Sequence, residues 1–274
     1  MTTTPLPPIT NITNIDQVVD AIEGIVQWST ANASRLGYFA ALYKRITIAI
    51  RTAIAEQKFE DGPRMERFDV TFASRYFAAL NGHFHPGQFP APTHSWVVAF
   101  TGALLPDPII VQQMLAGVNA HIDLDLGIAA EQIAPGAQLP SLHNDFNMVN
   151  AVLASQVNGV LDEIDELSPV LADIYDVLQQ HEIDLIGDAL KVTRDSAWCF
   201  AQKLAIEPPI LHPAAIMVHD LEVAQLGTLI LHPPGLLANV VKTIAAQESR
   251  DIVHNIQVLD GIASTVARLG VMAS

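Results

Sequence analysis

A histidine and an aspartate four residues apart, His121 and Asp125, carry the clearest chemical signal in this sequence. They lie inside an apolar stretch, 111–132, whose length and composition predict a buried helix. Residues four apart on an α-helix share one face, so this imidazole and this carboxylate could bind one metal ion. Zinc, iron and manganese accept both ligands, whereas magnesium prefers carboxylate and water. A divalent metal is therefore the expected cofactor.

The cost of burying charge is the reason to place a site on this helix. A carboxylate taken out of water costs several kcal/mol unless it is paired or metal-bound. Two other interpretations of the pair stay open: a core histidine hydrogen-bonded to its neighbour, and acid–base work without metal. Asn119 and Asp123 point elsewhere on a regular helix and are expected to support the pair.

Further metal ligands have to come from other helices, and Glu66 and Asp195 are the candidates. Glu66 shares a helix face with Asp69, three residues later. The alternative for Glu66 and Asp69 is pairing with the arginines of the same helix, and the alternative for Asp195 is a salt bridge to Lys191.

The candidate catalytic residues are carboxylates and arginines near these ligands. Asp69 or Asp145 would act as the base, and Arg75 or Arg194 would hold developing negative charge. Asp145 also fits a simpler structural role, because an acidic residue is favourable in the first turn of a helix.

The remaining reactive side chains give weaker signals. His143, Asn147 and Asn150 follow helical spacing and form one stripe. The histidines His83, His85 and His94 lie in a turn-rich segment that could close over a site. Cys199 follows Trp198 in an apolar helix, which predicts a buried thiol and not a nucleophile.

Helical periodicity runs through almost the whole chain, and signals for strands are few. We expect an all-α fold, a single compact multi-helix bundle of about nine to eleven helices. The proline- and threonine-rich residues 1–15 read as a flexible N-terminal arm, and 16–274 as a single helical domain. The main expected helices begin after Asp16 and then cover 35–59, 63–80, 111–132, 139 onward, 182–205 and 250–269.

Composition limits the classes of partner. The 274 residues carry a net charge of −15, which disfavours nucleic acid and anionic membranes as main partners. We find no apolar run long enough to predict a membrane span and no secretory signal. One cysteine excludes an intramolecular disulfide. A cytoplasmic location, a partly apolar small-molecule substrate and a homo-oligomer are the expectations.

Four segments together resemble the bacterial family known as domain of unknown function 5995. They are RMERFDVTFASRYF at 64–77, GVNAHIDLDLGIA at 117–129, DFNMVNAVLASQV at 145–157 and TRDSAWCFAQKL at 193–204. The family name implies no activity. The resemblance implies only that certain residues belong to characteristic motifs: Arg64, Glu66, Asp69, Arg75, Asn119, His121, Asp125, Asp145, Asn150, Arg194, Asp195 and Trp198.

A weaker similarity is to the zinc-dependent phospholipase C and single-strand nuclease group, which binds metals through His-x-x-x-Asp or His-x-x-x-Glu pairs on helices. His121 with Asp125 fits one such pair, and Asp69 precedes His83 at a suitable interval. The second pair would be His143 and Asn147, where asparagine departs from the acidic ligand. The group's N-terminal tryptophan ligand and its secretion signal are also missing.

These observations favour a metal-dependent hydrolase of a phosphoester or related ester. The first alternative is a lyase similar to class I terpenoid cyclases, which bind a prenyl diphosphate through magnesium. Asp123 with Asp125, the stretch 145–150 and Arg194 loosely match its acidic and diphosphate-sensing motifs. The second alternative is a non-enzymatic carrier of an apolar ligand, or a scaffold, whose polar residues form a satisfied buried network.

Overall fold

A computed structural model describes residues 4–171 and 185–261, and these form a bundle of helices without any strand. The predicted all-α class is confirmed. The elements, in chain order, are α1 (Ile15–Ala31), α2 (Leu36–Ala55), α3 (Gly62–Phe84), α4 (His94–Gly102), α5 (Ile110–Val118), η1 (Asn119–Leu126), α6 (Gly127–Ile133), η2 (Gly136–Leu142), α7 (His143–Leu167), α9 (Leu185–Ile206), η3 (Pro209–Leu211), α10 (His212–Leu231) and α11 (Leu236–Ala245). A further helical run covers 252–261.

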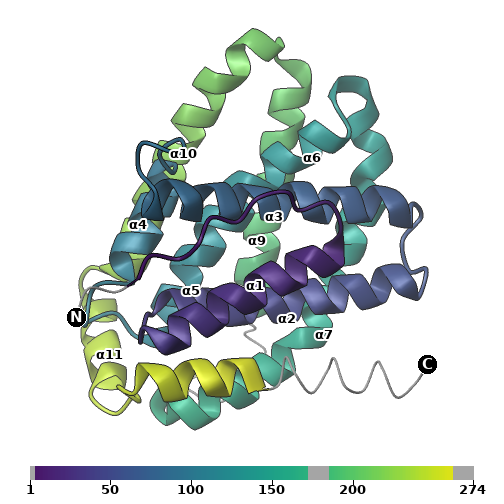
Figure 1. Cartoon of the computed structure of the whole chain (residues 1–274). Helices are drawn as coiled ribbons and strands as arrows, with labels where there is room; N and C mark the ends of the chain where they lie inside the picture. Colours follow the sequence, from purple (N-terminus) through teal and green to yellow (C-terminus); the bar gives the residue numbers. More distant parts are fainter. Residues whose placement is uncertain (1–3, 172–184, 262–274) are drawn as a thin grey trace.

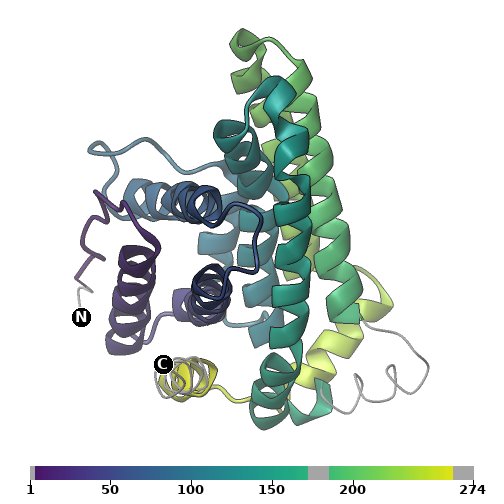
Figure 2. The same cartoon turned by 90° about the vertical axis from the view of Figure 1, so that its right-hand side faces the viewer.

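The segment α5–η1–α6 lies at the centre of the bundle (Figure 1). Its middle part, η1, packs against α3, α4, α9 and α10 as well as against its own neighbours. The view in Figure 2 places α1 on one side of the molecule and α9 and α10 on the opposite side. Polar side chains of η1 therefore have no route to water except between other helices.

The central helix is not one regular α-helix over 111–132. Residues Asn119–Leu126 form a π-helix, and all eight are buried. In a π-helix, each backbone hydrogen bond spans five residues instead of the four of an α-helix. π-Helices are rare in proteins, but those that occur are often at functional sites. Apolar spacing alone cannot distinguish the two helix types, because it reports only which residues are buried.

Residues 4–14 lie against the bundle, where a loose arm was expected. Leu6 is buried, and its carbonyl oxygen lies 2.7 Å from His85 Nε2. Asn81 holds Ile9 from both sides, accepting from its amide at 2.9 Å and donating to its carbonyl at 2.7 Å. Helix α1 begins two residues earlier than predicted, with Asn14 and not Asp16 as its N-cap. Residues 4–14 are thus anchored on α3.

Candidate functional site: an aromatic box around His121

The carboxylate of Asp125 lies at the centre of a buried network that joins three helices. Arg75 of α3 donates from Nε to Oδ1 at 2.6 Å, and Trp96 of α4 donates from Nε1 to Oδ2 at 2.8 Å. His121 Nδ1 lies 3.3 Å from Oδ2. Burial raises the pKa of Asp125, but the Arg75 cation and the bonds from His121 and Trp96 outweigh it and hold that pKa below its usual value. Asp125 is therefore an ionised, well-partnered carboxylate.

The imidazole of His121 is enclosed by aromatic rings. Phe72 stacks on it with 3.6 Å between ring centroids and 6° between planes, and Tyr43 packs edge-on at 4.6 Å. Phe39, Tyr76 and Trp96 complete this enclosure, which we call the aromatic box. Desolvation lowers the pKa of His121, which favours the neutral ring. If Nδ1–H donates to Asp125, the Nε2 atom carries a free lone pair, and it has no hydrogen-bond partner.

Asp69, one turn before Phe72 on α3, is the second unusual carboxylate. Burial, with a smaller contribution from the charge of Glu66, raises its pKa from 3.8 to about 7. Its Oδ2 atom is buried without a hydrogen-bond partner, and so is the hydroxyl of Tyr43. Burial, followed by the charge of Asp69, raises the pKa of Tyr43 well above its usual value. Asp69 and His121 thus both border Tyr43.

Three residues in or beside the aromatic box each carry a buried polar atom without a hydrogen-bond partner: His121 Nε2, Asp69 Oδ2 and Tyr43 Oη. Each such atom costs about 1–3 kcal/mol relative to a hydrogen-bonded one. Native proteins seldom leave polar atoms in this state unless a water, an ion or a ligand satisfies them. The aromatic box is for this reason the candidate functional site.

Two other polar residues of η1, Asn119 and Asp123, contact helix α10. Asn119 donates from Nδ2 to the carbonyl oxygen of Val223 at 2.8 Å, which ties η1 to α10. The backbone oxygen of Asp123 lies 2.9 Å from Nε2 of His219 on the same helix α10. Burial raises the pKa of Asp123, and a hydrogen bond from Ser196 of α9 opposes that shift.

Asp145 does not join His121 and is not free to act as a base. Its Oδ1 accepts from the amide of Glu60 at 2.6 Å, and its Oδ2 accepts from Arg64 at 2.9 Å and from the amide of Asp61 at 3.2 Å. These contacts anchor the turn between α2 and α3 to the start of α7. The structural alternative to the predicted catalytic role fits this environment.

Arg194 and Asp195 are also placed away from the predicted roles. Arg194 is buried, stacks on the Phe146 ring and donates to the Phe146 carbonyl oxygen at 2.6 Å and to the side-chain oxygen of Asn150. Desolvation lowers its pKa to about 10, but it remains a cation at neutral pH. It joins α9 to α7. Asp195 is exposed, so it is not a ligand of a buried metal.

Glu66 points to the N-terminal part of the chain, where Oε1 accepts from the amide of Ile15 at 3.3 Å. Within residues 4–171 and 185–261, no three His, Cys, Asp or Glu side chains lie together as a metal site would require. Both oxygens of Asp125 are already bonded to protein donors. The predicted set of His121, Asp125, Asp195 and Glu66 is therefore not assembled.

The residues that gave weaker signals in the sequence make contacts typical of structural residues. His143 bonds Asn147 on the exposed side of α7, and His94 lies 2.9 Å from Asp220 of α10. His85 lies on the Leu6 carbonyl, and His83 belongs to α3 and packs on Phe84 and Phe100. None of these contacts of the three histidines involves the aromatic box. Cys199 is exposed and not buried, because it occupies the outer face of α9 between Trp198 and Phe200.

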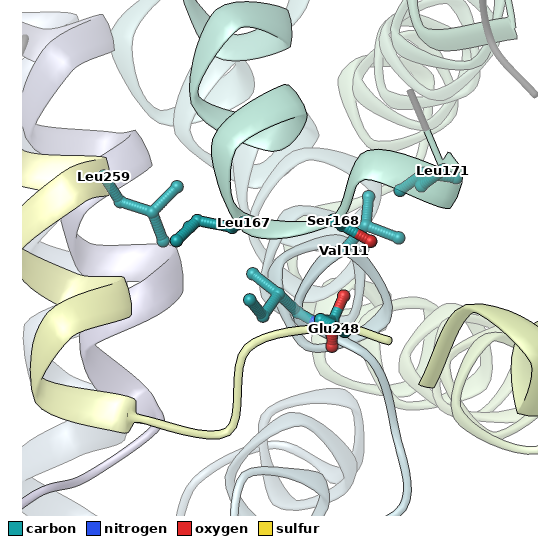
Figure 3. A pocket seen from close by; sticks show the side chains of 7 residues that line it. Val111, Leu167, Ser168, Leu171, Glu248 and Leu259 are labelled. Atoms are coloured by element: carbon teal, nitrogen blue, oxygen red, sulfur yellow. Dashed lines mark hydrogen bonds between the residues drawn. The ribbon is translucent and has the colours of Figure 1, made fainter. Parts of the chain in front are cut away.

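A small hollow lies between α5, the end of α7 and the segment after α11 (Figure 3), and none of the residues that line it belongs to the aromatic box. Its apolar wall includes Leu167 and Leu259, and Glu248 and Ser168 supply its polar atoms. The Oε2 atom of Glu248 accepts from the Ile110 amide at 2.9 Å. Burial raises the pKa of Glu248, opposed by that bond. This contact anchors the C-terminal segment to the start of α5.

The aromatic residues of the box were not predicted as functional. Tyr43 reads as one more apolar position on α2, and Trp96 as the core residue of a short helix. One feature of the sequence could have indicated the box: on α3, Asp69, Phe72 and Tyr76 lie close to one helix face.

The model of a family of unknown function, DUF5995, matches residues 15–233. The chain belongs to this family. The DUF5995 match covers every residue of the aromatic box, from Phe39 to His121, and ends just after α10. No curated protein and no solved structure matches the chain, and no match supports the similarity to the phospholipase C and nuclease group.

Proposed function

We propose that this DUF5995 protein is a hydrolase of a small ester or phosphoester and that its working groups are His121 and Asp69. The observation that carries the proposal is the set of three unpartnered buried atoms, His121 Nε2, Asp69 Oδ2 and Tyr43 Oη. A protein that needed only a stable core would gain by replacing them with apolar groups.

Asp125 and His121 have the roles of an orienting carboxylate and a base. A buried carboxylate on Nδ1 fixes the ring and its tautomer, and leaves Nε2 to take a proton. In the proposed reaction, a water molecule attacks the ester carbon or phosphorus and passes a proton to His121 Nε2. The lowered pKa of His121 keeps the ring neutral before this step.

Asp69 would supply the proton to the leaving oxygen. With a pKa of about 7, half of the Asp69 population is protonated near neutral pH, which suits a general acid. The proton held by His121 afterwards returns to Asp69 through solvent, so that both groups are reset. Arg75, whose side chain is 23% exposed, is the charged group of the network that reaches the surface and would hold the developing negative charge.

Entry of a substrate requires the aromatic box to open. Phe72 is partly exposed and lies flat on His121, so in this proposal a rotation of Phe72 uncovers Nε2. A partly apolar substrate would then take the place of the Phe72 ring.

A divalent metal ion held by only two protein ligands, with water in its other positions, gives a second form of this proposal, carried by the donor types. An imidazole nitrogen and a carboxylate oxygen without partners suit zinc, manganese or iron. His121 also has the bond from Nδ1 to a carboxylate that is usual for metal-binding histidines. A bound metal would lower the pKa of its water ligand and polarise the ester. Asp125 would then orient His121 and would not itself be a ligand.

The test is hydrolysis of p-nitrophenyl acetate, butyrate and phosphate and of bis(p-nitrophenyl) phosphate, with and without EDTA. We expect turnover of at least one, and a loss of about 100-fold or more in His121→Gln and in Asp69→Asn. His94→Gln, which changes an exposed histidine outside the box, should keep the wild-type rate. Activity that EDTA abolishes, with metal-dependent melting lost in His121→Gln, selects the metal form.

Three results would contradict the proposal. They are no turnover of any of the four compounds, unchanged turnover in both box variants, or an equal loss in His94→Gln. Turnover of a prenyl diphosphate with magnesium would favour the cyclase alternative. A co-purifying apolar molecule retained by His121→Gln would favour the carrier.

A further inference from the structure

Among the described residues, nothing covers a long apolar face of helix α10. Most of the exposed large apolar side chains of the described residues lie between 206 and 237, on the end of α9, on η3, on α10 and on the start of α11. On α10 itself they include Met217, Val218 and Leu221, each half exposed. Figure 2 shows this helix at the edge of the bundle, opposite α1.

The exposed positions of α10 follow a heptad spacing. Ala214, Val218, Leu221, Gln225 and Thr228 are four and three residues apart in alternation, and all five are exposed. Alternating steps of four and three produce the straight seam along which two helices pack as in a coiled coil. The inner face of the same helix is occupied by the bundle, since Asp220, Val223 and Gly227 are buried there.

Charge argues against a lipid surface as the occupant. Residues 204–241 contain no lysine or arginine, and the whole chain has a net charge of −15. A helix that lies on a membrane usually carries cations on its polar face, and anionic lipids repel a protein of this charge. Pro209–Leu231 is long and apolar enough to cross a membrane by composition, but its inner face packs on α4, α5 and η1.

We propose that this face is the two-fold interface of a homodimer, in which α10 packs antiparallel against α10 of a second copy. A helix of 20 residues is about 30 Å long and about 10 Å wide, so the seam covers on the order of 300 Å². Ile210 and Leu211 at one end and Leu236 and Leu237 at the other extend it toward the about 800 Å² per partner of a standard interface.

A second copy fits the composition better than an unlike partner. An isologous interface has to be complementary to itself, and a surface with like charges in its centre is not. The five heptad positions of the α10 seam carry no charge, and the exposed carboxylate of Glu222, the residue after Leu221, lies at the flank of the seam. Leu221 occupies the middle of the seam and would lie next to its own copy at the two-fold axis.

Sedimentation equilibrium of the full chain tests the interface, with Leu221→Lys as the disrupting variant. We expect a dimer for the wild type and a monomer for Leu221→Lys with an unchanged circular dichroism spectrum. Met148→Lys, at an exposed apolar position of α7 outside the seam, should remain dimeric. In a Cys199→Ser background, Leu221→Cys should form a disulfide between two copies when oxidised with copper–phenanthroline in air.

A wild-type monomer at about 100 µM, well above the micromolar dissociation constants of weak interfaces, would overturn the proposal. So would a dimer that Leu221→Lys leaves intact, or binding of the wild-type monomer to vesicles of phosphatidylcholine and phosphatidylglycerol. The catalytic proposal does not depend on these outcomes, since the aromatic box lies within one chain.

Discussion

At the residue scale, the pKa values of the two buried carboxylates beside the aromatic box are shifted in opposite directions. Asp125 receives donors from Arg75, Trp96 and His121, and these more than offset burial, so that its pKa falls. Asp69 has no such donors, and its pKa rises to about 7. When the surroundings shift the pKa values of two acidic groups in opposite directions, one group stays ionised and the other can carry a proton.

The raised pKa of Asp69 predicts a specific dependence of stability on pH. The folded state holds the Asp69 proton up to about pH 7, whereas the unfolded chain releases it near pH 3.8. The unfolded state therefore binds fewer protons in this window, and the free energy of unfolding falls as the pH rises through it. Relative to Asp69→Asn, the free energy of unfolding of the wild type should fall by on the order of 4 kcal/mol between these two pH values.

Urea unfolding of both proteins at several pH values measures this difference. In Glu66→Gln the upper end of the window should move to lower pH, because Glu66 contributes to the raised pKa. A wild type whose stability relative to Asp69→Asn does not fall between pH 4 and pH 7 would show that Asp69 is ionised and paired.

At the element scale, the aromatic box depends on close contacts that place η1. A Cβ atom on Gly127 would come within 2.6 Å of the Ala197 carbonyl oxygen of α9. A Cβ atom on Gly117 would come within 2.5 Å of the Phe39 ring, which itself borders His121. The segment before and after the π-helix is thus held at both ends by contacts that only glycine permits.

Gly127→Ala should reduce the free energy of unfolding by about 1–3 kcal/mol, because α6 and α9 have to separate. The matched control is Gly24→Ala on α1, where nothing lies within 4 Å of the added Cβ atom. That change should stabilise the protein by about 0.5–1 kcal/mol through helix propensity. Similar effects of the two substitutions in urea unfolding would contradict the close approach at Gly127.

The sequence predicts the elements better than it predicts the site. Apolar spacing identified the helical class and the burial of His121 and Asp125, because both follow from local periodicity. It could not show that Arg75 and Trp96 meet at Asp125, since those contacts join residues 50 and 29 positions away. It also placed Asp145 and Arg194 at a site, although both are used to connect helices.

The anchoring of residues 4–14 could not be predicted from the sequence, for a similar reason. Prolines and threonines indicate a loose arm, but the contacts that anchor residues 4–14 come from Asn81 and His85 at the far end of α3. Local composition contains no information on such distant partners.

At the scale of the whole molecule, the excess of acid is the dominant surface property. The net charge of −15 is spread over one bundle, in which charges of the same sign repel at long range. Some attraction opposes this repulsion: the buried amine of Lys44 on α2 binds Glu23 of α1 and Asp260 of the last described helix.

Screening should therefore stabilise the protein. We expect the melting temperature to rise when ionic strength increases from about 0.01 M to about 0.15 M, since the Debye length shortens from about 30 to about 8 Å. Differential scanning calorimetry in sodium chloride measures the change. A melting temperature that falls with salt would mean that ion pairs such as Lys44 with Glu23 outweigh the repulsion.

The state of His121 tests the central claim most directly, because the proposed chemistry requires a free Nε2 lone pair. Two-dimensional ¹H–¹⁵N NMR of the imidazole nitrogens, with the His121 signals assigned by their loss in His121→Gln, reports which nitrogen carries the proton. We predict a neutral ring at pH 7, protonated on Nδ1 and unprotonated on Nε2, with a pKa below 6.5. A proton on Nε2 at pH 7, in either the neutral or the charged ring, would contradict the account.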